Sequence, residues 1–164
     1  MAVVAGCSSS KPAGTGTTQP AISGDAGDLD ALVGEVSCTD DPRVDTYTAH
    51  LSKMGTGGAL SFEIQSSDPA PPAKGGDTFM VKITDATGAA MTGDLTVSLY
   101  MPDHGHGTTV DPVITFDPAT QTYKLDPLYL FMPGVWRIQL SSYAGSADGG
   151  APVDSVFFYF CIEG

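Results

Sequence analysis

The segment from Met101 to Thr108, Met-Pro-Asp-His-Gly-His-Gly-Thr, holds the side chains best suited to chemistry, including two of the three histidines of the chain. In an extended backbone, residues two apart point to the same side, so His104 and His106 can present two imidazoles to one ion. Met101 adds a thioether, and a thioether with imidazoles suits copper, Cu(I) above all. The segment therefore predicts a copper site, with glycines that let the backbone bend around the ion.

A complete metal site needs a third or fourth ligand from elsewhere in the chain. The first candidate is Met132, in a Met-Pro-Gly turn, and the weaker candidates are His50 and Met54. The alternative interpretation is that a glycine-rich loop carries two exposed histidines and that Met132 fills a gap in the core, as methionines commonly do. The hypothetical ligand set is Met101, His104, His106 and Met132.

No arrangement typical of catalysis occurs in the sequence. The histidines lack a nucleophile elbow or a comparable local motif, and phosphate-binding loops, dinucleotide fingerprints and haem-attachment motifs are missing. Aspartates are so frequent that pairs of carboxylates say nothing about glycoside cleavage. We expect a binding protein and not an enzyme.

The net charge is −12, from 19 acidic residues against 7 basic ones. Such a surface repels the phosphates of nucleic acids and of anionic lipids, so neither is an expected partner. The run Asp25, Asp28 and Asp30 invites a calcium interpretation, but it lacks the central glycine and the final glutamate of a helix–loop–helix calcium loop. Solvated linker aspartates are the better interpretation.

The three cysteines are an odd number, which in an exported protein calls for an explanation of the unpaired thiol. Cys7 ends the sequence Val-Ala-Gly-Cys and resembles the lipobox cysteine of bacterial lipoproteins, which is acylated after signal cleavage. Cys38 and Cys161 then remain as a pair. Their disulfide would tie the two ends of the domain together, and it requires an oxidising compartment. The alternative, a metal or redox pair, has no Cys-x-x-Cys spacing to support it.

These features predict an exported protein, lipid-anchored on the periplasmic or cell-surface side. Only six residues precede Cys7, fewer than a signal peptide needs. We therefore expect residues 1–7 to be a signal-peptide remnant with a lipobox, either because translation starts upstream or because the sequence has been trimmed. Residues 8–37, rich in Ser, Gly, Thr, Pro and Asp, are predicted to be a flexible linker. No run of about 20 apolar residues occurs, so the lipid is the only membrane anchor expected.

Residues 38–164 are predicted to form one all-β domain. Short β-branched and aromatic runs are separated by turn residues, and several runs alternate apolar with polar side chains, as around Trp136, which is expected to anchor the core. This spacing favours an antiparallel β-sandwich of seven or eight strands. The predicted strands lie near residues 44–51, 58–65, 77–84, 94–101, 111–116, 121–131, 134–142 and 154–161.

Two blocks resemble a known family: Met-Pro-Asp-His-Gly-His-Gly at residues 101–107 and Met-Pro-Gly-Val-Trp at residues 132–136. With their surroundings, over roughly residues 58–160, they are similar to the YtkA-like and FixH-like group of small bacterial envelope domains. The resemblance implies an immunoglobulin-like sandwich, often in lipoproteins, and a link to copper handling or oxidase assembly. The residues that match its His/Met motif and its turn methionine are Met101, His104, His106 and Met132.

Two hypotheses follow from these observations. The first is a copper-binding accessory or chaperone domain that exchanges metal with a copper-accepting or copper-donating envelope protein. It predicts that the Met132 turn lies beside the histidine loop. The second is a metal-free structural or protein-interaction module of the envelope. It predicts that the two blocks point apart, or that Met101 and Met132 pack inward.

Overall fold

A computed structural model describes residues 38, 40–148 and 150–164 of the protein. The predicted lipidation site Cys7, the signal-peptide remnant 1–7 and the linker 8–37 lie outside the described residues. The boundaries proposed for these segments therefore stay predictions.

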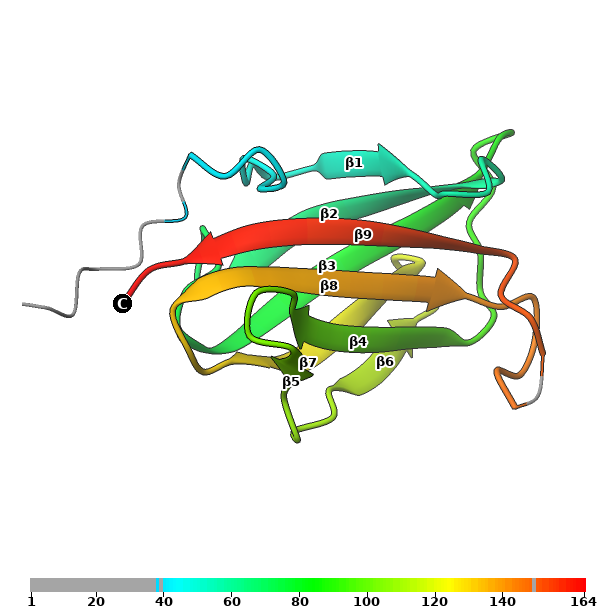
Figure 1. Ribbon diagram of the computed structural model, residues 1–164. Helices are drawn as coiled ribbons and strands as arrows, with labels where there is room; N and C mark the ends of the chain where they lie inside the picture. Colours follow the sequence, from blue (N-terminus) through cyan, green and yellow to red (C-terminus); the bar gives the residue numbers. More distant parts are fainter. Residues whose placement is uncertain (1–37, 39, 149) are drawn as a thin grey trace, which may run out of the picture. The chain divides into compact units, whose positions relative to one another are not determined.

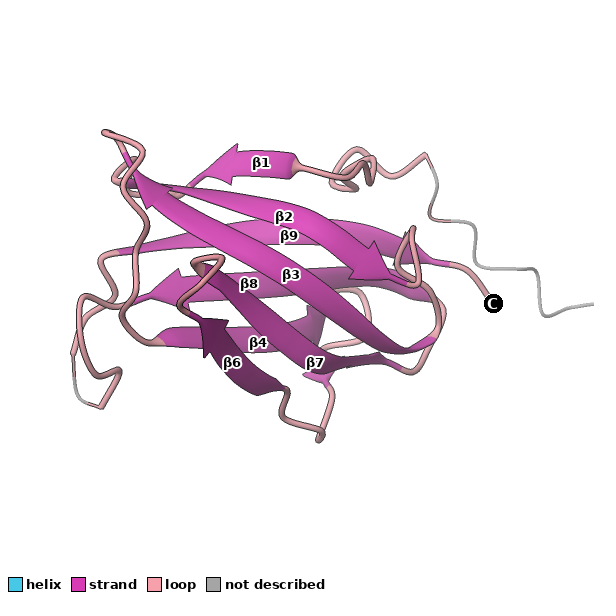
Figure 2. Ribbon diagram, turned by 180° about the vertical axis from the view of Figure 1, so that it is seen from behind, coloured by secondary structure: helices cyan, strands magenta, loops and turns pink. Residues whose placement is uncertain are grey.

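Two antiparallel sheets pack face to face and enclose the core (Figures 1 and 2). In the five-stranded sheet the order is β1-β2-β3-β7-β6, and in the four-stranded sheet it is β5-β4-β8-β9. The strands are β1 (Leu51–Met54), β2 (Leu60–Asp68), β3 (Gly75–Asp85), β4 (Leu95–Met101), β5 (His106–Gly107), β6 (Val113–Asp117), β7 (Thr122–Leu130), β8 (Gly134–Ser142) and β9 (Asp154–Ile162).

Alternation of apolar and polar residues explains the sandwich. Because successive side chains of a strand point to opposite faces, the long strands β2, β3 and β9 bury about every second residue against the other sheet. Trp136 is fully buried, as the sequence predicted. Around it the inward positions of three other strands supply Phe62, Ile64, Phe79, Val81, Ile83, Val156, Phe158 and Phe160, all at most 3% exposed. Burying each such side chain contributes about 1.5–3 kcal/mol, and the all-β sandwich prediction is confirmed.

The number and the bounds of the strands differ from the prediction of seven or eight strands. The structure has nine strands in its described part, because it adds β5, a two-residue strand paired with the end of β4. The strand predicted at 44–51 is wrong. Its last residues form a turn, in which Leu51 N donates to Thr48 O over 3.1 Å and His50 adopts a φ of 63°, so pairing begins only at Leu51.

The Cys38–Cys161 disulfide is formed, with the two Cα atoms 5.4 Å apart and 123 positions apart in sequence. Closing a loop of that length stabilises the fold by up to about 4–5 kcal/mol in the chain-entropy view. Within residues 38, 40–148 and 150–164 there is no helix, and hence none long and apolar enough to cross a membrane.

Candidate metal site at the β4–β5 hairpin

The hairpin between β4 and β5 carries three of the four predicted ligands. β4 ends at Met101, and the backbone carbonyl of that residue accepts hydrogen bonds from the amides of His104 (3.2 Å) and Gly105 (2.9 Å). Gly105 has a φ of 72°, a conformation that favours glycine. The chain then returns so that His106 pairs directly opposite Met101, which places these two side chains on the same face of the sheet.

Gly134, the first residue of β8, lies next to both Met101 and His104. A Cβ added at Gly134 would lie 2.9 Å from the Met101 methyl carbon, which is too close for an unchanged fit, and 4.0 Å from His104 Nε2. The φ of Gly134 is 127°, so both the backbone and the limited space favour glycine here. The methyl end of a thioether from the core and an imidazole nitrogen from an exposed turn therefore both approach the gap left by the missing side chain of Gly134.

The His106 ring completes the cluster from the other strand of the hairpin. Its centroid lies 5.7 Å from that of His104, and it stacks on Phe131 with centroids 5.9 Å apart. His106 Nδ1 lies 3.2 Å from the Gly107 carbonyl oxygen. Because a carbonyl only accepts, Nδ1 carries the proton in this contact and the lone pair of Nε2 stays free for a metal.

The spacing of the two imidazoles is compatible with one shared metal ion. With metal–nitrogen bonds of about 2 Å, two imidazoles on one ion have ring centres roughly 5–6 Å apart, which matches the His104–His106 spacing. The nearby thioether supplies the soft donor that Cu(I) prefers. However, the described residues contain no group of three or more His, Cys, Asp or Glu side chains placed to hold a metal. A site here thus depends on methionine.

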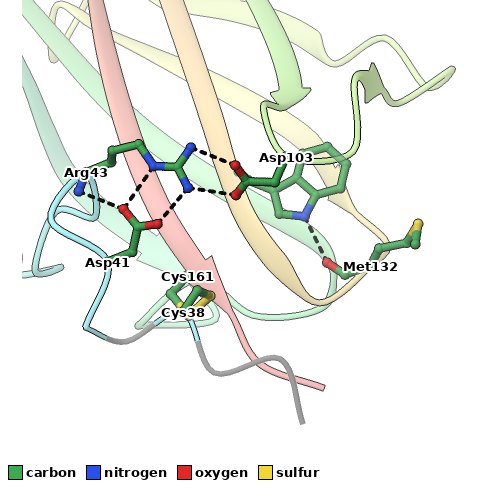
Figure 3. The surroundings of a disulfide bond; sticks show 7 residues. Cys38, Asp41, Arg43, Asp103, Met132 and Cys161 are labelled. Atoms are coloured by element: carbon green, nitrogen blue, oxygen red, sulfur yellow. Dashed lines mark hydrogen bonds and ion pairs between the residues drawn. A yellow bond between two sulfur atoms is a disulfide. The ribbon is translucent and has the colours of Figure 1, made fainter. Parts of the chain in front are cut away.

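Met132 lies beside this hairpin, although its side chain is not brought into the cluster. The stacking of Phe131 on His106 places the Met132 turn against the histidine loop, as the copper hypothesis predicted. The Met132 carbonyl accepts a 2.9 Å hydrogen bond from Trp136 Nε1, and Figure 3 shows its thioether pointing away from Asp103. The side chain packs against the core and is partly buried.

The structure meets one expectation of each hypothesis. The two blocks lie side by side, but Met101 is fully buried and Met132 packs against the core, as the metal-free hypothesis predicted. The weaker ligand candidates belong elsewhere: Met54 is exposed on β1 of the other sheet, and His50, just before β1, contacts Glu63 over 2.6 Å. The candidate ligands that remain are Met101, His104 and His106 of the hairpin, and Met132 beside it.

An exposed ionic bridge adjoins the hairpin. Arg43 contacts both carboxylate oxygens of Asp103, at 2.9 and 2.7 Å, and both of Asp41, at 2.9 and 2.6 Å (Figure 3). These bonds from Arg43 lower the pKa of Asp41 to about 2 and hold the pKa of Asp103 below its usual range. The guanidinium therefore leaves Asp103, the neighbour of His104, ionised and oriented.

Sequence reasoning missed several residues of this site. Arg43 is 60 positions from Asp103, and no local pattern connects them. The sequence marked Gly134 as a turn residue, but not as the position on which Met101 and His104 converge. Phe131 directly precedes the recognised block at residues 132–136, but its stacking on His106 depends on tertiary structure.

A small all-β domain with a His/Met hairpin at one end of its sandwich is the class that fold and site define. The YtkA-like family matches the sequence over residues 57–141, more than half of the chain. The protein belongs to the YtkA-like family. No curated protein and no solved structure gives a significant match.

Proposed function

We propose that this protein is an exported lipoprotein whose YtkA-like domain binds copper and exchanges it with an envelope protein, without turning over a substrate. The observation that supports the proposal is that the methyl end of Met101 and Nε2 of His104 both lie within 4.0 Å of the position that a Cβ of Gly134 would occupy, with the His106 ring beside them. These donors combine soft and borderline character, which is the combination that copper favours.

Each residue has a distinct role in the proposed site. His104 stands on an exposed turn and would meet the ion first, while His106 is half-buried and oriented by Phe131. Met101 would bind from the core side, where burial excludes water and favours Cu(I) over the strongly hydrated divalent ions. Met132 would complete the site after its side chain turns toward the hairpin. Bound copper would supply the cargo, and the protein's residues would hold and release it.

The disulfide supports export. A bridge between cysteines 123 positions apart persists in an oxidising compartment, and it is rare in the bacterial cytosol. The lipobox-like sequence at Cys7 supports a lipid anchor, which would leave the domain on the outer side of a membrane. Fatty-acid labelling of the full chain, with Cys7→Ser as the control, tests this part of the proposal: labelling of the variant at the wild-type level would contradict it.

The decisive experiment is a titration of the oxidised protein with Cu(I), and separately with Cu(II), against a chelator of known affinity. We expect one copper per chain, and we expect the His104→Ala/His106→Ala double variant to lose it. His50→Ala is the matched control, because it removes the remaining histidine of the chain, which lies outside the hairpin and contacts Glu63. No stoichiometric binding, or an unchanged affinity in the double variant, would overturn the proposal.

A specific observation favours a second candidate, a metal-free interaction module. On the outer face of the four-stranded sheet the Arg137 guanidinium lies between the rings of Tyr100 and Phe157, 4.9 and 5.3 Å from their centroids. Its buried Nε atom has no hydrogen-bond partner among the described residues. Arginine and tyrosine are typical of interface hot spots. This candidate predicts that the wild-type protein fails to bind copper in the titration above.

A further inference from the structure

A short segment next to the disulfide is attached to β9 at both of its ends. We call residues 40–45 the strap. At its start, Asp41 N donates to Cys38 O over 3.1 Å, and Cys38 is bonded to Cys161 of β9. At its end, Asp45 N donates to Tyr159 O over 2.8 Å, and the Asp45 carboxylate accepts from Tyr159 N over 2.9 Å. The strap is therefore fixed to β9 at two positions, one covalent and one hydrogen-bonded.

Arg43, within the strap, reaches across the end of the four-stranded sheet to the hairpin. Figure 3 shows its guanidinium between the Asp41 and Asp103 carboxylates. Five hydrogen bonds of 2.6–2.9 Å hold it: the backbone amide and the side-chain Nε and Nη2 of Arg43 donate to Asp41, and Nη1 and Nη2 donate to Asp103. A planar guanidinium that engages both oxygens of each carboxylate fixes their relative orientation, which a point charge does not do.

The disulfide, the strap and the histidine share one hollow. Cys38, Asp41, Asp103, His104 and Gly134 are among the residues that line it. Asp103 directly precedes His104, so holding Asp103 limits where the His104 ring can lie. The Arg43–Asp103 pair thus ties the hairpin turn to a distant loop, while His106 is held separately by its stacking on Phe131.

We propose that Arg43 is a positioning residue for His104, acting through Asp103, and that the Cys38–Cys161 disulfide makes this possible by anchoring the strap. The inference rests on the proposed copper site for its functional meaning, but its structural part concerns the hairpin alone. Loss of the disulfide would loosen the strap, release Asp103 and weaken metal binding. The disulfide would thus support a site of which it is not a ligand.

The first test compares Arg43→Ala and Arg43→Lys with Lys124→Ala. Lys124 forms an exposed 2.7 Å ion pair with Asp126 on β7, and its removal controls for the loss of a surface salt bridge. Amide hydrogen exchange of His104 and Gly105, measured without metal, is the direct readout. We expect exchange to accelerate roughly three- to tenfold in Arg43→Ala, less in Arg43→Lys, and not in Lys124→Ala, because an exposed network contributes only modest free energy.

The second test asks whether the disulfide acts through the strap. Cys38→Ser/Cys161→Ser is preferred to a reductant, because free thiolates would bind Cu(I) themselves. We expect copper affinity and His104 amide protection to fall as in Arg43→Ala, and we expect Arg43→Ala to add nothing further in the serine background. Arg43→Ala in the intact disulfide protein provides an independent arm if the serine variant is too unstable to study.

The outcomes separate this inference from the proposed function. Unchanged exchange of the His104 and Gly105 amides in Arg43→Ala overturns the positioning role, whether or not copper binds. Additive effects of the serine and alanine changes overturn the link to the disulfide. A wild-type protein that binds no copper overturns the proposed function, while faster exchange in Arg43→Ala would still support the positioning of His104.

Discussion

Two buried carboxylates lie at opposite ends of the sandwich, and they differ in their hydrogen bonding and in the direction of their pKa shifts. Asp154 begins β9, at the end where β8 finishes, and Asp77 lies near the start of β3, at the end that carries the hairpin (Figure 1). Asp154 accepts hydrogen bonds of 2.7–3.0 Å from four backbone amides, those of Gly57, Ala59, Leu60 and Ser155. Burial alone would raise the pKa of Asp154, but these four bonds together lower it.

Asp77 is fully buried with half of its hydrogen-bonding capacity unused. One oxygen accepts a 2.9 Å bond from Ala73 N, while Oδ2 has no partner among the described residues. Burial raises the pKa of Asp77 to about 6, and the single Ala73 bond, set against repulsion from Asp68, does not offset it. The same end holds Gly134 at a φ of 127° and the exposed His104.

This difference in hydrogen bonding indicates which end of the sandwich mainly stabilises the fold; we call it the scaffold end. The Asp154 carboxylate joins the β1–β2 turn to β9 with both oxygens hydrogen-bonded, which is what stability alone requires, although the Ser142 Oγ atom at the same end has no partner among the described residues. The hairpin end retains an unsatisfied carboxylate, a glycine-only conformation and an exposed imidazole. Departures of this kind cluster at functional sites, because the surrounding structure must stabilise what the site itself does not.

The largest expected effect comes from breaking the scaffold end. Asp154→Ala leaves four backbone amides without their acceptor, and we expect it to lower the free energy of unfolding by about 3 kcal/mol. Urea unfolding measures this loss. Asp117→Ala is the control, because Asp117 also accepts bonds from a nearby amide and a hydroxyl but is exposed. A loss no greater than that of the control would show that Asp154 is not a structural anchor.

At the hairpin end, Gly134→Ala separates backbone strain from site chemistry. A non-glycine residue at this φ costs about 1–3 kcal/mol, and the new methyl would enter the gap between Met101 and His104. Gly75→Ala is the matched control: its φ is 131°, and its added Cβ meets nothing within 4 Å. We expect both changes to lower stability, Gly134→Ala the more because its new methyl meets the buried Met101 methyl carbon, and we expect at least a tenfold loss of copper affinity from Gly134→Ala alone. Equal copper affinities would contradict the assignment of the gap.

The two ends also differ in how far the sequence could predict them. Alternation along the strands was sufficient for the sandwich and for Trp136, because burial on one face is a local periodic signal. The disulfide followed from counting cysteines. The candidate ligands of the hairpin were proposed as neighbours in sequence, since His104 and His106 are two residues apart.

What the sequence could not predict depends on long-range or subtle geometry. The bridge from Arg43 to Asp103 joins a loop to a strand end 60 positions away, and no periodicity encodes it. The composition of residues 44–51 is typical of a strand. Instead of joining a sheet, the segment contacts β9 through the Asp45 carboxylate, which accepts a hydrogen bond from Tyr159 N, and the chain then turns at His50. The missing partner of Asp77 Oδ2 is a property of packing, which composition does not reveal.

Asp77→Asn tests whether the buried and partly unpaired carboxylate at the hairpin end lowers the free energy of unfolding. A pKa raised in the folded state means that the folded protein binds protons more tightly, so the stability contributed by this group is present at low pH and is lost as pH rises from about 4 to about 6. The neutral amide removes the buried charge while keeping an acceptor for Ala73. We expect a gain of about 1–2 kcal/mol above pH 6 and none at pH 4. Unfolding at both pH values measures it, and a variant less stable than wild type at pH 8 would contradict the expectation.

The smallest expected effect concerns the ring that supports His106. Phe131→Leu removes the stacking on His106 and the edge contact with Trp136, whose centroid is 5.6 Å away, at a cost of roughly 1 kcal/mol. Phe116→Leu is the control, since it removes the contact with Tyr123, at a centroid distance of 4.9 Å, on the five-stranded sheet. Both variants should lose similar stability, but only Phe131→Leu should weaken copper binding, by roughly threefold to tenfold, because only there does the ring orient a ligand. If both variants bind copper equally well, Phe131 is part of the scaffold, and the functional end of the molecule is restricted to Met101, His104 and the space at Gly134.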